Sequence, residues 1–100
     1  MAFMSELKGQ DFKSTDRPTA KRIRRLVEMQ NHKCALTGMP LTPDDANLDH
    51  ILPIASGGKH QMGNVQVVHK TINHMTSTVP QDEFIEWCRR VVEFADRRNV

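Results

Sequence analysis

A stretch near the middle of the chain combines side chains that could bind a cation and activate a water molecule. It reads Leu48-Asp49-His50-Ile51-Leu52-Pro53 and is followed by Gly57-Gly58, Asn64-Val65 and Asn73. Carboxylate and amide oxygens are ligands that hard divalent cations prefer. A neutral imidazole, with a pKa of about 6.5, can take a proton from water at neutral pH. This set of groups suits the metal-assisted hydrolysis of a phosphodiester.

Two short strands and a short helix are expected to position these groups. The strands are predicted over residues 46–52 and 65–68, and the second is rich in β-branched residues. A glycine-containing loop over residues 53–63 joins them, and residues 69–77 can form a short helix.

Asp49 and His50 are neighbours in the first predicted strand, where adjacent side chains point to opposite faces. Both can serve one site only if the strand ends or bends at this point. Pro53 makes an early end plausible.

Two longer helices are predicted on either side of this middle part. The first covers residues 18–31, where Pro18 fits the first turn and either Asp16 or Thr19 can cap the helix. The second covers residues 81–98, with acidic residues near its start and arginines near its end. Its apolar face consists of Phe84, Cys88, Val91, Val92 and Ala95. The predicted fold is α+β: a two-stranded antiparallel hairpin plus a short helix, flanked by an N-terminal and a C-terminal helix.

The length of 100 residues predicts one small domain over residues 18–100, preceded by an arm over residues 1–17. No apolar run approaches the roughly 20 residues that a membrane helix needs. No signal peptide is recognisable, and there are two cysteines, Cys34 and Cys88. We therefore expect a cytoplasmic protein without a membrane partner, in a reducing compartment.

The net charge is only +2, but basic residues gather on and beside the first predicted helix. The cluster contains Arg17, Lys21, Arg22, Arg24, Arg25 and Lys33, opposed by Glu28. Such a cluster is often a solvated helix face. It becomes a nucleic-acid contact only if a site for phosphate chemistry lies nearby.

The residues from about 34 to 77 resemble the HNH endonucleases, whose active site is the ββα-metal motif. The pattern reads Asp-His-Ile-x-Pro, Gly-Gly, Asn-Val and Asn, and the motif core is expected over residues 46–77. The resemblance implies that His50 is the general base and that Asp49 and Asn73 hold one cation. It also implies that Asn64 bonds backbone groups across the loop and fixes the placement of His50. An Asp-plus-Asn ligand set favours Mg²⁺ or Mn²⁺.

Each of these residues also has an ordinary structural interpretation. His50 could be a structural histidine at a strand end, and Asp49 a loop residue that caps a turn. Asn73 could lie on a helix surface, while Asn64 could contact the substrate directly. His60, in the Gly-Gly loop where the family often has a histidine, could simply pack the loop.

The chain departs from the family at the places where many relatives bind a structural zinc ion. Two Cys-x-x-Cys pairs correspond here to Cys34-x-x-Thr37 and His69-x-x-Ile72. One thiolate and one imidazole cannot complete a tetrahedral site. We therefore expect no structural zinc, with Cys34 and Cys88 as small buried residues and the flanking helices bracing the motif.

The resemblance implies DNA, double-stranded, as the partner. A lysine that the family often carries is replaced by Thr76, which leaves Lys70 and His74 as candidate phosphate contacts. Further candidates for the DNA backbone are Arg22, Arg24, Arg25 and Lys33.

A monomer or homodimer would nick one strand per site with low sequence specificity, unless a protein partner supplies specificity. The alternatives are a non-catalytic nucleic-acid-binding module with the same fold and a small helical interaction protein.

Overall fold

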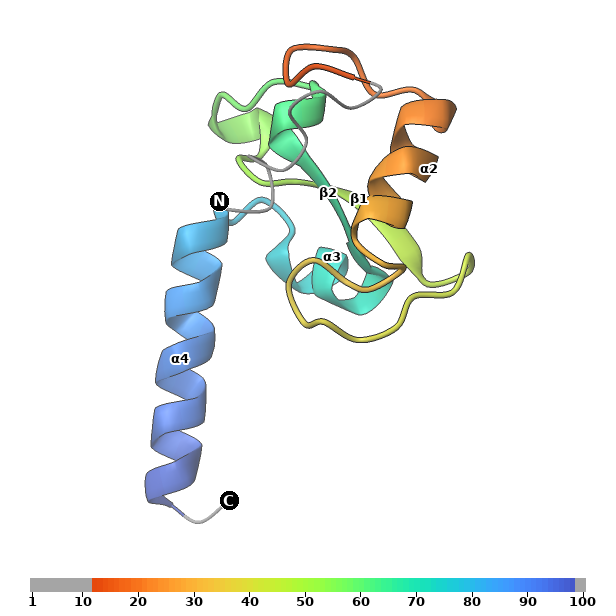
Figure 1. The fold of residues 1–100 in the computed structure, drawn as a ribbon. Coiled ribbons are helices and arrows are strands. Elements are labelled where there is room, and N and C mark those ends of the chain that lie inside the picture. Colours follow the sequence, from red (N-terminus) through yellow and green to blue (C-terminus); the bar gives the residue numbers. More distant parts are fainter. Residues whose placement is uncertain (1–11, 99–100) are drawn as a thin grey trace.

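The computed structural model describes residues 12–98, so most of the predicted arm lies outside the described residues. The elements are α2 (Ala20–Met29), β1 (Ala46–His50), the 3-10 turns η1 (Ile54–Ser56) and η2 (Met62–Asn64), β2 (Val65–His69), α3 (Lys70–Thr76) and α4 (Gln81–Arg97). Figure 1 shows α2 and α3 packed around a central hairpin, and α4 extending from it. The predicted α+β fold, with a hairpin and a short helix in the middle, is confirmed.

The two strands form an antiparallel hairpin in which Leu48 faces Val67, Asp49 faces Gln66 and His50 faces Val65. Residues 65–68 of β2 are all buried, including Gln66. β1 ends at His50, two residues before its predicted end at position 52. The strand therefore ends at the point where Asp49 and His50 could both reach one site.

The core lies between α2 and the hairpin and is formed by Phe12, Leu26, Met62, Val65 and Val67. Phe12 belongs to the segment predicted as an arm, yet it is buried in this core.

The segment that follows Phe12 is bonded to the loop before β2. The N–H of Met62 donates to the carbonyl of Asp16, and the N–H of Gly63 donates to that of Ser14, both over 2.7 Å. A side chain at Gly63 would place its Cβ 2.9 Å from the Cβ of Ser14, so this close approach requires glycine. The described part of the arm is therefore packed against the domain.

Gln30 falls on the apolar face of the first predicted helix, and the structure explains this polar residue. Its Nε2 atom donates to the carbonyl of Val67 over 2.8 Å, and its Oε1 atom accepts from the N–H of Val67 over 3.0 Å. The side chain therefore pairs with the free edge of β2 and ties the end of α2 to the sheet.

α4 carries an apolar face that the described residues leave largely uncovered. None of its residues is buried, and Trp87 and Val91 are 55% and 66% exposed. Cys88 is only partly buried. The prediction that Cys88 is buried is therefore wrong. The helix is tied to the motif at its first residue, where Oε1 of Gln81 accepts from Nε2 of Gln66 over 2.7 Å, and the rest of α4 extends away from the hairpin (Figure 1). Within residues 12–98, no helix combines the length and apolar character needed to cross a bilayer.

Candidate functional site

Asp49, His50 and Asn73 line one cavity of about 240 Å³. The end of β1 supplies Asp49 and His50, and α3 supplies Asn73. Other lining residues come from the loop after β1 and from the chain after α3: Pro53, Ile54, Ala55, Ser77 and Thr78. The hairpin thus brings together three predicted site residues that lie up to 24 positions apart in the chain.

The carboxylate of Asp49 is held by two buried side chains. Its Oδ2 atom accepts from Nε2 of Gln66 over 2.9 Å, and its Oδ1 atom accepts from Oγ1 of Thr76 over 3.4 Å. Asp49 itself is only 7% exposed. Each carboxylate oxygen has a second lone pair, so these bonds still leave capacity for a cation.

Sequence reasoning missed Gln66 and Thr76 as partners of Asp49. The signal for Gln66 was a single polar residue inside an apolar strand, directly across the hairpin from Asp49. Thr76 stands where the family often has lysine, but it is turned inward and is only 4% exposed.

The side chain of Asn73 lines the cavity, and its amide is free of hydrogen bonds to the described residues. Its backbone carbonyl accepts from the N–H of Ser77 over 3.1 Å and lies 3.0 Å from the hydroxyl of Thr76, whose single hydrogen it shares with Asp49. Within residues 12–98 its side-chain amide forms no hydrogen bond. The Oδ1 atom of Asn73 is therefore available to a ligand of the cavity.

The donor set fits a hard divalent cation rather than a soft one. Asp49 and Asn73, which line the cavity, offer a carboxylate and an amide oxygen. No group of three or more His, Cys, Asp or Glu side chains in residues 12–98 could hold a metal ion by itself. Water and substrate would have to supply most of the coordination, as is usual for Mg²⁺.

His50 contacts the loop histidine His60. Its Nε2 atom lies 2.8 Å from Nδ1 of His60, and the ring centroids are 5.1 Å apart. Burial and the nearby His60 lower the pKa of His50 from its ordinary value of 6.5, and the charge of Asp49 opposes this only in part. His50 is therefore neutral at neutral pH, as a proton acceptor must be.

Asn64 fastens the loop that follows His50. Its Oδ1 atom accepts from the N–H of Leu52 over 2.9 Å, and its Nδ2 atom donates to the carbonyls of Leu52 and Lys59 over 3.0 and 2.9 Å. Gly58 lies so close that a Cβ there would stand 1.8 Å from the carbonyl oxygen of Leu52. The chain on both sides of the loop is thus held together beside His50.

The corner around Cys34 and His69, where the sequence predicts no structural zinc, contains hydrogen bonds to both side chains. Sγ of Cys34 accepts from the N–H of His69 over 3.3 Å. Burial raises the pKa of the Cys34 thiol, but the Thr37 side chain and the backbone groups of His69, Leu36 and Thr37 outweigh it. The net result is a pKa below the ordinary 9.0.

Both ring nitrogens of His69 have neighbours in this corner. Nδ1 accepts from the N–H of Thr71 over 3.1 Å, and Nε2 lies 3.9 Å from a carboxylate oxygen of Asp45. Thr37 and Ile72, at the other two positions, carry no zinc-binding group. The expected lack of a structural zinc ion stays a prediction.

Lys70 and His74 lie beside the site rather than in it. With Asn47, Thr71 and Asn73 they line a neighbouring cavity of about 390 Å³. Asn73 therefore borders both cavities. Lys70 also approaches Asp45, with 3.9 Å between Nζ and Oδ1, so its charge is partly balanced.

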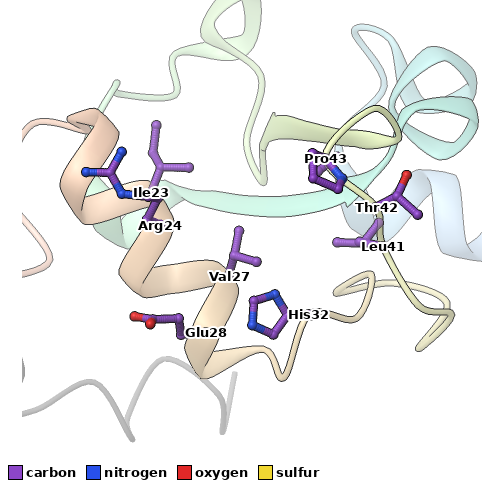
Figure 2. Close-up of a pocket in the computed structure, with 9 residues that line it drawn as sticks. Ile23, Arg24, Val27, Glu28, His32, Leu41, Thr42 and Pro43 are labelled. Carbon is purple, nitrogen blue, oxygen red and sulfur yellow. The ribbon is translucent and has the colours of Figure 1, made fainter.

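The basic residues of α2 do not line either of these cavities. Arg22 pairs with Asp16 and Arg25 with Glu28, each over 3.8 Å, while Lys33 is exposed. Arg24 borders a separate, mainly apolar cavity of about 440 Å³. Figure 2 shows Ile23 and Val27 of α2 on one side and the segment of Leu41, Thr42 and Pro43 on the other, with the guanidinium of Arg24 turned away from that segment. Glu28 and His32 also line this larger cavity, but none of Asp49, His50 and Asn73 does.

Comparison with known proteins gives a likeness of fold. No protein-family model and no curated protein matches the chain. Among solved structures, the chain is similar to a type II restriction endonuclease, with a TM-score of 0.55 and 21% sequence identity. The match covers 95% of this chain but only 46% of the restriction enzyme. The chain therefore shares the fold of a region that makes up less than half of that enzyme.

Proposed function

We propose that this protein is a metal-dependent DNA endonuclease of the HNH type, which hydrolyses phosphodiester bonds and nicks one strand per site. The observation that carries the proposal is the single cavity lined by Asp49, His50 and Asn73. A protein that only bound nucleic acid would have no need of an imidazole with a lowered pKa beside two oxygen donors. The fold shared with a type II restriction endonuclease agrees with it.

In this proposal, Asp49 and Asn73 hold one Mg²⁺ or Mn²⁺ through their side-chain oxygens. When bound, the cation would supply positive charge that offsets the negative charge growing on the phosphate and the leaving 3′ oxygen. Gln66 and Thr76 orient the carboxylate of Asp49 for this task.

His50 is the general base of the proposal. It takes a proton from a water molecule, whose oxygen attacks phosphorus while the bond to the 3′ oxygen breaks. The leaving 3′ oxygen takes a proton from solvent water and His50 returns its proton to solvent, so the products are a 5′-phosphate and a 3′-hydroxyl. Asn64 is a positioning residue in this account, because its bonds to Leu52 and Lys59 hold the loop that follows His50.

DNA contacts are proposed on two surfaces. Lys70 and His74 border the cavity next to Asn73 and could bind a neighbouring phosphate. The α2 surface with Arg22, Arg24, Arg25 and Lys33 would attract the backbone without reading bases. Because these residues lie outside the central cavity, their effect would be on affinity and its salt dependence rather than on chemistry.

A plasmid-nicking assay tests the proposal. Supercoiled DNA should become open-circular with Mg²⁺ or Mn²⁺ and stay intact with EDTA. His50→Ala should lower the rate by about 10²–10⁴-fold. His32→Ala is the matched control and should cut normally, because His32 lines the apolar cavity and not the cavity of Asp49, His50 and Asn73. Cation-independent DNA binding without any cutting would favour a non-catalytic binding module instead.

A further inference from the structure

His60 lies in the loop between β1 and β2, and its ring contacts that of His50. The 2.8 Å separation between Nε2 of His50 and Nδ1 of His60 is that of a hydrogen bond. His60 is itself exposed and belongs to no core cluster. Its contact with His50 therefore cannot be explained as core packing.

The loop geometry gives His60 a fixed position despite its exposure. The neighbouring carbonyl of Lys59 accepts from Nδ2 of Asn64 over 2.9 Å and from the N–H of Gln61 over 3.1 Å. Asn64 also holds Leu52, just after β1. Asn64 therefore joins the two chain segments that carry His50 and His60.

The placement of hydrogens in this pair has only two neutral solutions. One of the two facing nitrogens must carry the hydrogen and the other must accept it. If His60 donated from Nδ1, the hydrogen of neutral His50 would lie on its own Nδ1, and His50 would have no free lone pair. If His50 donates from Nε2, its Nδ1 keeps a lone pair that can take a proton. Only the second arrangement allows His50 to act as a base.

We infer that His60 is a positioning residue for the proposed reaction: its Nδ1 atom accepts the Nε2–H of His50 and holds that ring in the tautomer whose Nδ1 can receive a proton. The inference rests on the proposed role of His50 as general base. When Nδ1 of His50 gains the proton from water, Nε2–H is still present and His60 still accepts it. The bond therefore serves both protonation states of the base and needs no rearrangement during the reaction.

Kinetics with variants of the full chain test this inference. His60→Ala should lower kcat by about 10–100-fold, the usual cost of losing the partner of a functional histidine, with KM little changed. His60→Asn should recover most of the loss, because its Oδ1 can accept in place of Nδ1. His50→Ala with His60→Ala should be no slower than His50→Ala alone. Equal losses in His60→Ala and His60→Asn, or additive losses in the double variant, would overturn the inference.

Nitrogen NMR of the histidine rings in the metal-free protein gives a second, activity-independent readout. His50 of the wild type should carry its hydrogen on Nε2, and His60→Ala should yield a mixture of tautomers. A wild-type His50 with its hydrogen on Nδ1 would contradict the inference whatever the activity. Failure of the proposed function would look different: the wild type would not cut DNA with any cation, while the His50 tautomer could still be as expected.

Discussion

Gln66 donates a hydrogen bond from Nε2 to Oδ2 of Asp49 across the two strands, over 2.9 Å. The same nitrogen also donates to Oε1 of Gln81 over 2.7 Å. Gln66 is fully buried, so its amide cannot turn to solvent. A buried polar contact of this kind fixes the orientation of a carboxylate at the edge of the cavity, which a water-exposed contact would not do.

Replacing Gln66 with methionine should therefore weaken cation binding. The substitution keeps a similar volume in the buried strand but removes the donor to Asp49. We expect cation affinity to fall about 10–100-fold, as for other partners of metal ligands. Titration of Mn²⁺ by calorimetry measures this directly. Unchanged Mn²⁺ affinity in a folded Gln66→Met variant would mean that Gln66 does not orient the carboxylate.

The pH dependence of cutting should follow the titration of His50. Burial, followed by His60, lowers the pKa of His50 below 6.5, so the neutral base persists below that pH. The rate should therefore be flat above pH 6.5 and fall as the pH drops through the lowered pKa. The free energy of unfolding should depend on pH in the same direction. The contribution of His50 is fully present above pH 6.5 and is lost as the pH falls through the lowered pKa of His50. A midpoint above pH 6.5 in the kcat profile would contradict the assignment.

Substitution of Asn64 should loosen the loop after β1. Asn64→Ala removes three hydrogen bonds to Leu52 and Lys59 and should lower the free energy of unfolding by about 1–3 kcal/mol. Asn64→Asp should do no better, because it keeps the acceptor for the N–H of Leu52 but loses both donor bonds. Chemical denaturation gives the stability and steady-state kinetics the activity. An Asn64→Ala variant with wild-type kcat would rule out a positioning role.

A methyl group at Gly58 should disturb the same loop by a different route. Gly58→Ala would push Cβ to 1.8 Å from the carbonyl oxygen of Leu52, so backbone must move, at about 1–3 kcal/mol. Gly38→Ala is the matched control. Position 38 has open space but a φ of +72°, which costs about 1–2 kcal/mol. Both variants should be less stable, but only Gly58→Ala should lose activity per folded molecule. Equal activities would show that the loop does not position His50.

The sequence alone predicts the elements of the motif well because their signals are local. Turn residues, an apolar strand and the spacing of Asp49, His50 and Asn73 lie within one hairpin and its following helix. The early end of β1 at His50 agrees with the effect expected from Pro53.

Other features depend on contacts between distant parts of the chain, and the sequence does not reveal them. The bonds of Gln30 with Val67 join positions 37 residues apart, and the place of Gln30 on an apolar helix face does not reveal which backbone groups it bonds. Phe12 looks like part of a polar arm until its packing is seen. The apolar face of α4 shows that the helix is amphipathic, but its periodicity cannot say whether this chain covers that face.

The most direct test of the central claim is anomalous diffraction from a crystal of the protein soaked in Mn²⁺. One strong peak is expected within coordination distance of an Asp49 carboxylate oxygen and Oδ1 of Asn73, with His50 beside it. A peak held by other residues, or the absence of any peak at saturating Mn²⁺ in a crystal that leaves this cavity open, would contradict it.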